Sequence, residues 1–261
     1  MKKLFLSVLF LVSMVYAGSD INTTAYDFNL TKDKKATAYV NWDTQHIAVE
    51  IGKKRIVLPD ISEDFMDYKK FVSDISESLF FEDLNFDGYA DIGVIVGVGY
   101  GGLNVFADYY FYDPKKAQFH KYFSNVSNLT IIGNTEVLHA PMKSGTGYFH
   151  DYYQIDKEGR AFLFLSASTS WPDEEEGNML TDYSAHNVKV KVKKAYFYDG
   201  WDGKRLKSYL IQGDKISKVL DMVSSEGHTW IKVLYRGKKR DFRYWVKMND
   251  LVFEEIIVRE E

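Results

Sequence analysis

Apolar and polar residues alternate with a period of two along short runs of this chain, a pattern typical of β-strands. The runs before residue 187 span 35–42, 46–51, 56–58, 78–84, 92–98, 105–112, 129–132, 148–155 and 161–165. Further runs at 194–199, 209–214, 230–233 and 244–251 follow one another at strand-and-turn spacing. Turn-forming residues such as Gly52 to Lys54 and Asp156 to Gly159 separate most of them. The pattern predicts an all-β protein, built as an antiparallel sandwich or a propeller-like array of sheets.

One segment has helical periodicity instead. Between residues 63 and 76, Phe65, Tyr68, Val72 and Ile75 recur at helical intervals, and Ser62 is placed to cap the first turn. We therefore expect a single helix there.

The first 17 residues resemble an export signal. Lys2 and Lys3 precede an apolar run from Leu4 to Val15, and Ala17 supplies the small residue that a signal peptidase requires. This run is short for the roughly 30 Å hydrocarbon core of a membrane. We expect cleavage after Ala17 and release into the bacterial periplasm without a transmembrane anchor; an uncleaved anchor is the alternative.

Composition and charge narrow the class of protein. A hydrophobic content of 46% and an aromatic content of 16% exclude intrinsic disorder, and the lack of cysteine excludes disulfides, thiolate metal sites and cysteine nucleophiles. Residues 18–187 carry 14 basic and 26 acidic side chains, whereas residues 188–261 carry 17 basic and 11 acidic ones. This change of sign predicts two domains, 18–187 and 188–261, of which the first attracts cationic partners.

The segment from Asp83 to Asp91 has the spacing of a calcium loop. Oxygen-bearing side chains stand at relative positions 1, 3, 5 and 9 and a glycine stands at position 6, which suits a hard cation that needs many oxygen ligands. The expected ligands are Asp83, Asn85, Asp87, the Tyr89 carbonyl and Asp91. Position 12 is Val94 and strands flank the motif, so we expect a structural Ca²⁺ that ties strands together, as in FG-GAP-type repeats. A turn without metal is the alternative.

Motifs of enzymes are weak or missing. The glycine-rich segment 97–102 precedes a strand instead of a helix, so we interpret it as a flexible hairpin connection and not as a phosphate loop. The six histidines show no helical pairing, and no nucleophile elbow is present. We expect a protein without enzymatic activity; hydrolysis of a glycan by an unrecognised pair of carboxylates is the alternative.

A second glycine-rich segment, from Ser144 to Tyr148, leads directly into an alternating strand. It predicts an exposed loop tip that carries a hydroxyl group and an aromatic ring with a polar end. An ordinary hairpin without a binding role is the alternative.

The order of these features resembles the bacterial periplasmic inhibitors of i-type lysozyme and the related calcium-binding immunity proteins that neutralise lysozyme-like toxins. The resemblance rests on the DLNFDGYADI segment, the VFADYYFYD strand, and SGTGY followed by FHDYYQI, and it covers roughly residues 75 to 165. It implies that a β-rich domain inserts its SGxxY loop into the lysozyme cleft. Ser144 and Tyr148 would then contact the catalytic carboxylates, and Gly145 would be required for the shape of the loop.

The last 74 residues resemble a bacterial SH3-like barrel, because Trp245, Asp250 and Leu251 match the WIxxxDL pattern at the end of that fold. Such modules bind peptidoglycan or peptides through an aromatic groove. The candidate groove residues are Tyr196, Tyr198, Trp201 and Trp230, which could equally fill the core of a small barrel. The sequence thus supports two functions: inhibition of a lysozyme-like muramidase, or non-catalytic binding of peptidoglycan or peptide.

Overall fold

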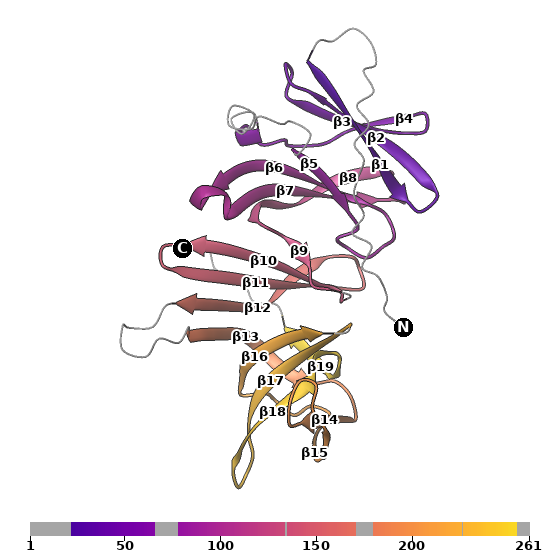
Figure 1. The fold of residues 1–261 in the computed structure, drawn as a ribbon. Helices are drawn as coiled ribbons and strands as arrows, with labels where there is room; N and C mark the ends of the chain where they lie inside the picture. Colours follow the sequence, from indigo (N-terminus) through magenta and orange to yellow (C-terminus); the bar gives the residue numbers. More distant parts are fainter. Residues whose placement is uncertain (1–21, 66–77, 134, 171–179, 226, 255–261) are drawn as a thin grey trace, which may run out of the picture. The chain divides into compact units, whose positions relative to one another are not determined.

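The computed structural model describes residues 22–65, 78–133, 135–170, 180–225 and 227–254. Nearly all regular structure in these ranges is antiparallel β-sheet (Figure 1), which confirms the all-β prediction. The predicted export signal lies outside the described residues, as does the predicted helix beyond residue 65. No helix within the described ranges is long and apolar enough to span a bilayer.

Contacts divide the described residues into two compact units. The first holds the residues up to Asp83 together with Gly88–Gly97 and Phe106–Asn125; the second holds Leu84–Asp87, Val98–Val105 and the residues from Val126 onward. This division differs from the boundary at residue 187 that charge predicts. Strand β13 (Leu180–Val190) runs across that position, because its apolar residues pack into a core shared with strands on both sides of it.

The first unit contains two four-stranded sheets. One has the order β1-β2-β3-β4 and the other the order β5-β6-β7-β8. Their bounds are β1 Thr23–Thr31, β2 Lys34–Asn41, β3 His46–Ile51, β4 Lys54–Val57, β5 Leu79–Glu82, β6 Asp91–Gly99, β7 Asn104–Asp113 and β8 Gln118–Ser127.

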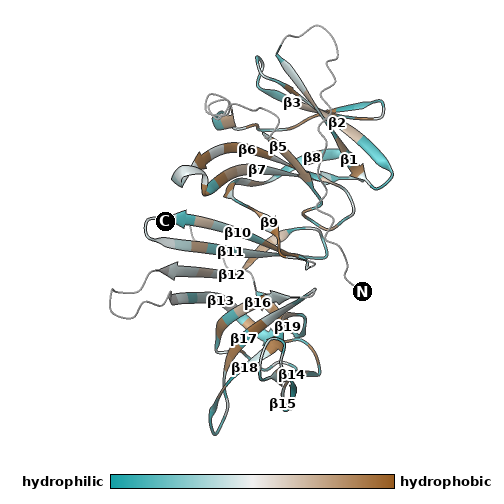
Figure 2. Ribbon diagram, viewed as in Figure 1, coloured by the Kyte–Doolittle hydropathy of each residue, from teal (hydrophilic) through white to brown (hydrophobic). Residues whose placement is uncertain are grey.

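Both sheets of the first unit contribute to one core, as expected for a sandwich. In β1, Tyr26, Phe28 and Leu30 alternate with exposed residues, and the Phe28 ring stacks on Phe81 of β5 with 4.1 Å between the ring centroids. Strand β6 is apolar along most of its length, as the brown colour in Figure 2 shows. Burial of these side chains, at roughly 1.5–3 kcal/mol each, is the main stabilisation of this unit.

The second unit contains a six-stranded sheet, β19-β13-β12-β11-β10-β9, and a five-stranded sheet, β15-β14-β18-β17-β16. The strands of the first are β9 Thr130–Ile131, β10 Val137–Ser144, β11 Gly147–Ile155, β12 Ala161–Ser170, β13 Leu180–Val190 and β19 Leu251–Glu254. Those of the second are β14 Lys194–Tyr198, β15 Arg205–Ile211, β16 Lys218–Ser225, β17 His228–Arg236 and β18 Asp241–Lys247. Two 3-10 turns, η2 Tyr100–Gly102 and η3 Met248–Asp250, complete the unit.

The two sheets of the second unit share a core. Phe164 of β12 is fully buried and meets the Phe253 ring of β19 edge-on, with 4.8 Å between the ring centroids. Ile231 and Val246 bring strands of the five-stranded sheet into the same cluster. The residues after 187 therefore fold onto the six-stranded sheet, and the shared core includes Val137 of β10 and Tyr152 of β11.

Candidate functional site

The predicted loop from Ser144 to Tyr148 is the tip of the β10–β11 hairpin. The two strands pair as far as Ser144 opposite Gly147, which leaves Gly145 and Thr146 as a two-residue turn. Ser144, Gly145 and Thr146 are exposed. Gly145 has a φ of 54°, and a positive φ at the first central position is typical of the type II′ turn that suits the twist of a hairpin. The structure thus gives this segment the exposed position that an inserting loop requires.

Gly147 is constrained by close packing instead of by its backbone angle. A Cβ atom at this position would lie 3.0 Å from the carbonyl oxygen of Thr169 in β12. Any side chain there would press against the neighbouring strand. The two glycines of the motif therefore have separate roles, since Gly145 shapes the turn and Gly147 allows β11 to approach β12.

Lys143 and Tyr148 face each other across the hairpin just below the tip. They are partners in the strand register, and the Lys143 Nζ lies 4.4 Å from the centroid of the Tyr148 ring. A cation over an aromatic face is attracted by the ring quadrupole, at about 0.5–1 kcal/mol for an exposed pair. The tip consequently presents a positive charge, a flat ring and the Ser144 hydroxyl within a few residues of one another.

Two asparagine side chains cover the free edge of β10 near the tip. The Asn104 amide donates to the Lys143 carbonyl at 2.9 Å, and its Oδ1 accepts the Lys143 N–H at 2.8 Å. The Asn128 amide donates to the Pro141 carbonyl at 3.2 Å and to the Leu103 carbonyl at 2.8 Å. An edge strand otherwise exposes unpaired backbone groups. These side chains replace the missing strand and hold β10 in place up to the turn.

Tyr100 of η2 fixes the turn itself. Its hydroxyl oxygen accepts the N–H of Gly145 at 2.7 Å and also hydrogen-bonds the Ser144 side chain. These two bonds, with a smaller contribution from the charge of Lys143, lower the pKa of the Tyr100 hydroxyl. Tyr100 adopts a left-handed backbone with a φ of 50°, a strained conformation for a residue with a side chain. This backbone conformation directs the Tyr100 side chain toward the hairpin, where its hydroxyl contacts Gly145.

Sequence reasoning missed this brace. The segment 97–102 is predicted as a flexible connection, whereas the structure forms η2 there and links it to the hairpin tip. Tyr100 and Asn104 are 45 and 39 residues away from their partners, so no local pattern joins them. The one available signal is an asparagine at the start of a strand, a residue type whose side chain readily bonds backbone groups.

Two histidines that no sequence motif connects, His139 of β10 and His150 of β11, meet on the face of the hairpin that carries Tyr148. The His139 Nε2 and His150 Nδ1 atoms are 3.0 Å apart, so one ring donates a hydrogen bond to the other. The His139 ring also stacks on Tyr152, with 4.7 Å between centroids and 9° between ring planes. Burial lowers the pKa of His139 to about 4, and the proximity of His150 adds to this effect. The pKa of His150 is lowered by burial, partly offset by the charge of Asp151.

This pair should make stability depend on pH. An unfolded histidine takes up a proton near pH 6.5, while His139 in the folded protein resists protonation down to about pH 4. The unfolded chain therefore binds more protons in this window, and the free energy of unfolding falls as the pH drops through it. We expect a loss of about 1–2 kcal/mol from the pair, after allowance for partial exposure.

Urea unfolding at neutral and mildly acidic pH measures this loss. The double variant His139→Phe/His150→Phe should show a smaller decrease than the natural protein, because the two titrating groups are gone while aromatic stacking remains. The exposed His46→Phe is the matched control and should follow the natural protein. An equal decrease in all three proteins would contradict this assignment.

The predicted calcium loop lies between β5 and β6. The Asp83 Oδ2 accepts the N–H of Gly88 at 2.9 Å, and the Asn85 Oδ1 accepts the N–H of Asp87 at 3.1 Å. Both bonds curl the backbone so that positions 1, 3 and 5 of the motif lie on a tight bend. The backbone of this loop is thus bent as the predicted calcium loop requires.

Asp91 is placed differently from the other predicted calcium ligands. It is fully buried, and its Oδ1 accepts the N–H of Tyr112 in β7 at 2.9 Å. Its carboxylate therefore already supports the β6–β7 pairing. Within the described residues, no three His, Cys, Asp or Glu side chains gather as they would around a bound metal ion. The calcium site remains a prediction, in which Asn85 and the Tyr89 carbonyl must supply oxygens beside the carboxylates.

The four aromatic residues predicted to line a groove have different neighbours in the structure. Tyr198 meets Trp230 edge-on with 4.8 Å between centroids, but Trp230 is only 9% exposed and the Lys247 Nζ lies 5.5 Å from its ring centroid. Arg205 covers the Tyr196 ring at 4.6 Å. Trp201 lies in the turn between β14 and β15 and is 38% exposed. Trp230 thus belongs mainly to packing, and cations cover ring faces that a ligand would need.

Comparison with known proteins adds little to this picture. No family model and no curated protein matches the chain. A solved structure described as that of a Xanthomonas type IV secretion system related protein is similar to it, with 14% sequence identity and a TM-score of 0.41. The similarity covers 76% of this chain and 98% of that one.

Proposed function

We propose that this chain is an exported, non-enzymatic inhibitor of a lysozyme-like muramidase and acts by inserting the tip of its β10–β11 hairpin into the enzyme's cleft. The observation that carries the proposal is the exposed Ser144–Thr146 turn, which Tyr100 and Asn104 brace from outside the hairpin. A braced tip loses little conformational freedom on binding, so more of the contact energy contributes to affinity.

The chemistry of the tip complements a glycosidase cleft. Enzymes of this class use a pair of carboxyl groups on either side of the scissile bond. The Ser144 oxygen, whose proton is engaged with Tyr100, can accept a hydrogen bond from the protonated carboxyl group of the pair, and the Lys143 ammonium group offers a positive charge to the ionised one. Tyr148 supplies a flat ring with a polar end, which suits a sugar subsite. Inhibition then results from occlusion of the cleft.

A direct inhibition assay tests this proposal. Purified protein, titrated into a panel of i-type and other lysozyme-like enzymes acting on cell-wall substrate, should inhibit at least one of them in a one-to-one complex. The excess of acidic over basic residues in 18–187 should make association slower as salt concentration rises, because lysozyme-like targets of positive charge are then attracted less. If the protein inhibits none of the enzymes in the panel, the proposal that it is an inhibitor is wrong.

We further propose that the loop between β5 and β6 binds a structural Ca²⁺ through Asp83, Asn85, Asp87, the Tyr89 carbonyl and Asp91. The two side-chain-to-backbone bonds in the loop support this, because they curve the chain as a calcium loop does. The ion would fix the connection between β5 and β6 and have no part in contacting the target.

Calcium should raise the thermal unfolding temperature of this protein. A ligand that binds only the folded state stabilises it, by about 2.7 kcal/mol at a concentration 100 times its dissociation constant. Differential scanning calorimetry with Ca²⁺ and with chelator should show this shift, and Asp87→Ala should abolish it. Asp33→Ala, an exposed aspartate in the β1–β2 turn, should retain it. An identical unfolding temperature with Ca²⁺ and with chelator would rule out the site.

Binding of a wall polymer by the five-stranded sheet is the second candidate function. It is favoured by the excess of basic residues after residue 187, because positive charge attracts anionic wall polymers. Co-sedimentation with purified peptidoglycan sacculi distinguishes it from inhibition, since an inhibitor of the enzyme need not sediment with the substrate.

A further inference from the structure

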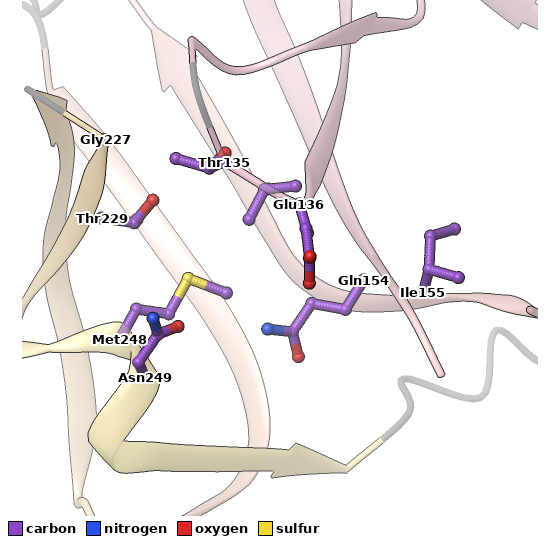
Figure 3. A pocket seen from close by; sticks show the side chains of 9 residues that line it. Thr135, Glu136, Gln154, Ile155, Gly227, Thr229, Met248 and Asn249 are labelled. Carbon is purple, nitrogen blue, oxygen red and sulfur yellow. The ribbon is translucent and has the colours of Figure 1, made fainter. Parts of the chain in front are cut away.

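The second unit contains a pocket distinct from the hairpin tip. Its volume is about 270 Å³, below the roughly 300–1,000 Å³ of pockets for drug-sized ligands. The turn before β10, the end of β11, the start of β17 and η3 form its walls (Figure 3). A space of this size suits a ligand of about one sugar ring.

Polar side chains converge on this pocket from separate parts of the chain. Glu136 precedes β10, Gln154 lies in β11 and Asn249 lies in η3, and Figure 3 shows all three around the cavity. Within the described residues, none of these three side chains forms a hydrogen bond with the protein. The two hydroxyl groups in the lining are already occupied: Thr135 donates to the Ile132 carbonyl, and Thr229 pairs with Ser224.

Three polar side chains that are not needed by the fold therefore remain available to a ligand. Two amides can each donate and accept, which matches hydroxyl groups, since these also do both. The pocket is lined by one carboxylate and, among its described lining residues, by no Lys, Arg or His. An anionic ligand would meet the Glu136 charge without a cation to offset it, whereas a cationic group would pair with it.

We propose that this pocket binds a monosaccharide-sized ligand rich in hydroxyl groups, and that a cationic amino group on the ligand strengthens binding through Glu136. Gln154 and Asn249 hydrogen-bond the hydroxyl groups of the ligand. This inference does not rest on inhibition of a muramidase, because the pocket and the hairpin tip share no residue.

Three probes of similar size and different charge test the proposal: glucosamine, N-acetylglucosamine and glucuronate. Saturation-transfer NMR with the full chain should show binding in the order glucosamine, N-acetylglucosamine, glucuronate. A charged hydrogen bond in place of a neutral one is worth about a tenfold difference in affinity. Glu136→Gln should therefore abolish the preference for glucosamine over N-acetylglucosamine, and Asn249→Ala should weaken both.

Gln212→Ala, an exposed amide in the turn after β15, is the matched control and should leave all three affinities unchanged. Thermal unfolding of each variant shows whether it is folded, and Glu136→Gln is a conservative change at an exposed position. Binding of none of the probes at millimolar concentration would overturn the proposal. So would binding that is equal for the three charges, or that is unaltered in both pocket variants.

Discussion

The double variant Ser144→Ala/Tyr148→Ala should lose inhibition of the target muramidase by at least about 100-fold. Each truncation removes a contact at the centre of the proposed interface, where hot-spot residues contribute about 2–4 kcal/mol. The variant should still fold, because Ser144 is exposed and Tyr148 is only partly buried, with the Lys143 ammonium as its close neighbour. Inhibition constants from a cell-wall lysis assay, together with thermal unfolding curves, measure both effects.

Ser208 and Tyr209 provide a matched pair for this experiment. They are adjacent, exposed and located in β15 of the five-stranded sheet. Ser208→Ala/Tyr209→Ala should inhibit as well as the natural protein if the hairpin tip is the inhibitory element. If both double variants inhibit normally, another surface contacts the enzyme. Loss of inhibition only in the second variant would move the contact to the five-stranded sheet.

The strands that sequence reasoning found are those with marked alternation or apolar runs. The predicted runs at 46–51, 105–112 and 148–155 correspond to β3, β7 and β11 almost residue for residue. Strands β1, β8, β10, β13 and β16 were missed. Strands β8, β10 and β13 are largely polar or interrupted, whereas β1 alternates between buried and exposed residues and its pattern was overlooked. In β8 only Phe119 and Ser127 are buried, and β10 contains Pro141. Partner strands stabilise such segments, and this contribution is not encoded in their own pattern.

The part of the candidate site that is contiguous in the sequence could be predicted, and the part that depends on strand pairing could not. Ser144, Gly145 and Tyr148 are contiguous, so their position on an exposed hairpin tip follows from glycine spacing and the alternating strand after it. Lys143 is adjacent to this motif, but its approach to the Tyr148 ring depends on the register of β10 against β11. That register is a property of the assembled sheet, in which turn length fixes which residues face each other.

Asn104→Ala should weaken inhibition by about tenfold although Asn104 lies outside the predicted contact surface. Asn104 is 1% exposed, and its amide makes both of the hydrogen bonds that satisfy the Lys143 backbone on the free edge of β10. Alanine removes both partners and leaves a backbone donor and acceptor unpaired, at a cost of about 1–3 kcal/mol for each buried group. The tip then gains freedom that must be lost again on binding.

Two further variants separate a positioning role from a general loss of stability. Asn29→Ala changes an exposed asparagine in β1 and should affect neither stability nor inhibition. Tyr100→Phe removes only a hydroxyl, the one that accepts the Gly145 N–H and bonds the Ser144 side chain, at an exposed site that contributes little to the core. If the brace positions the tip, Tyr100→Phe should weaken inhibition several-fold while the unfolding temperature stays nearly constant. Full inhibition by Tyr100→Phe and by folded Asn104→Ala would show that the hairpin holds its tip without help, since the turn and the strand pairing alone would then fix Ser144 and Tyr148.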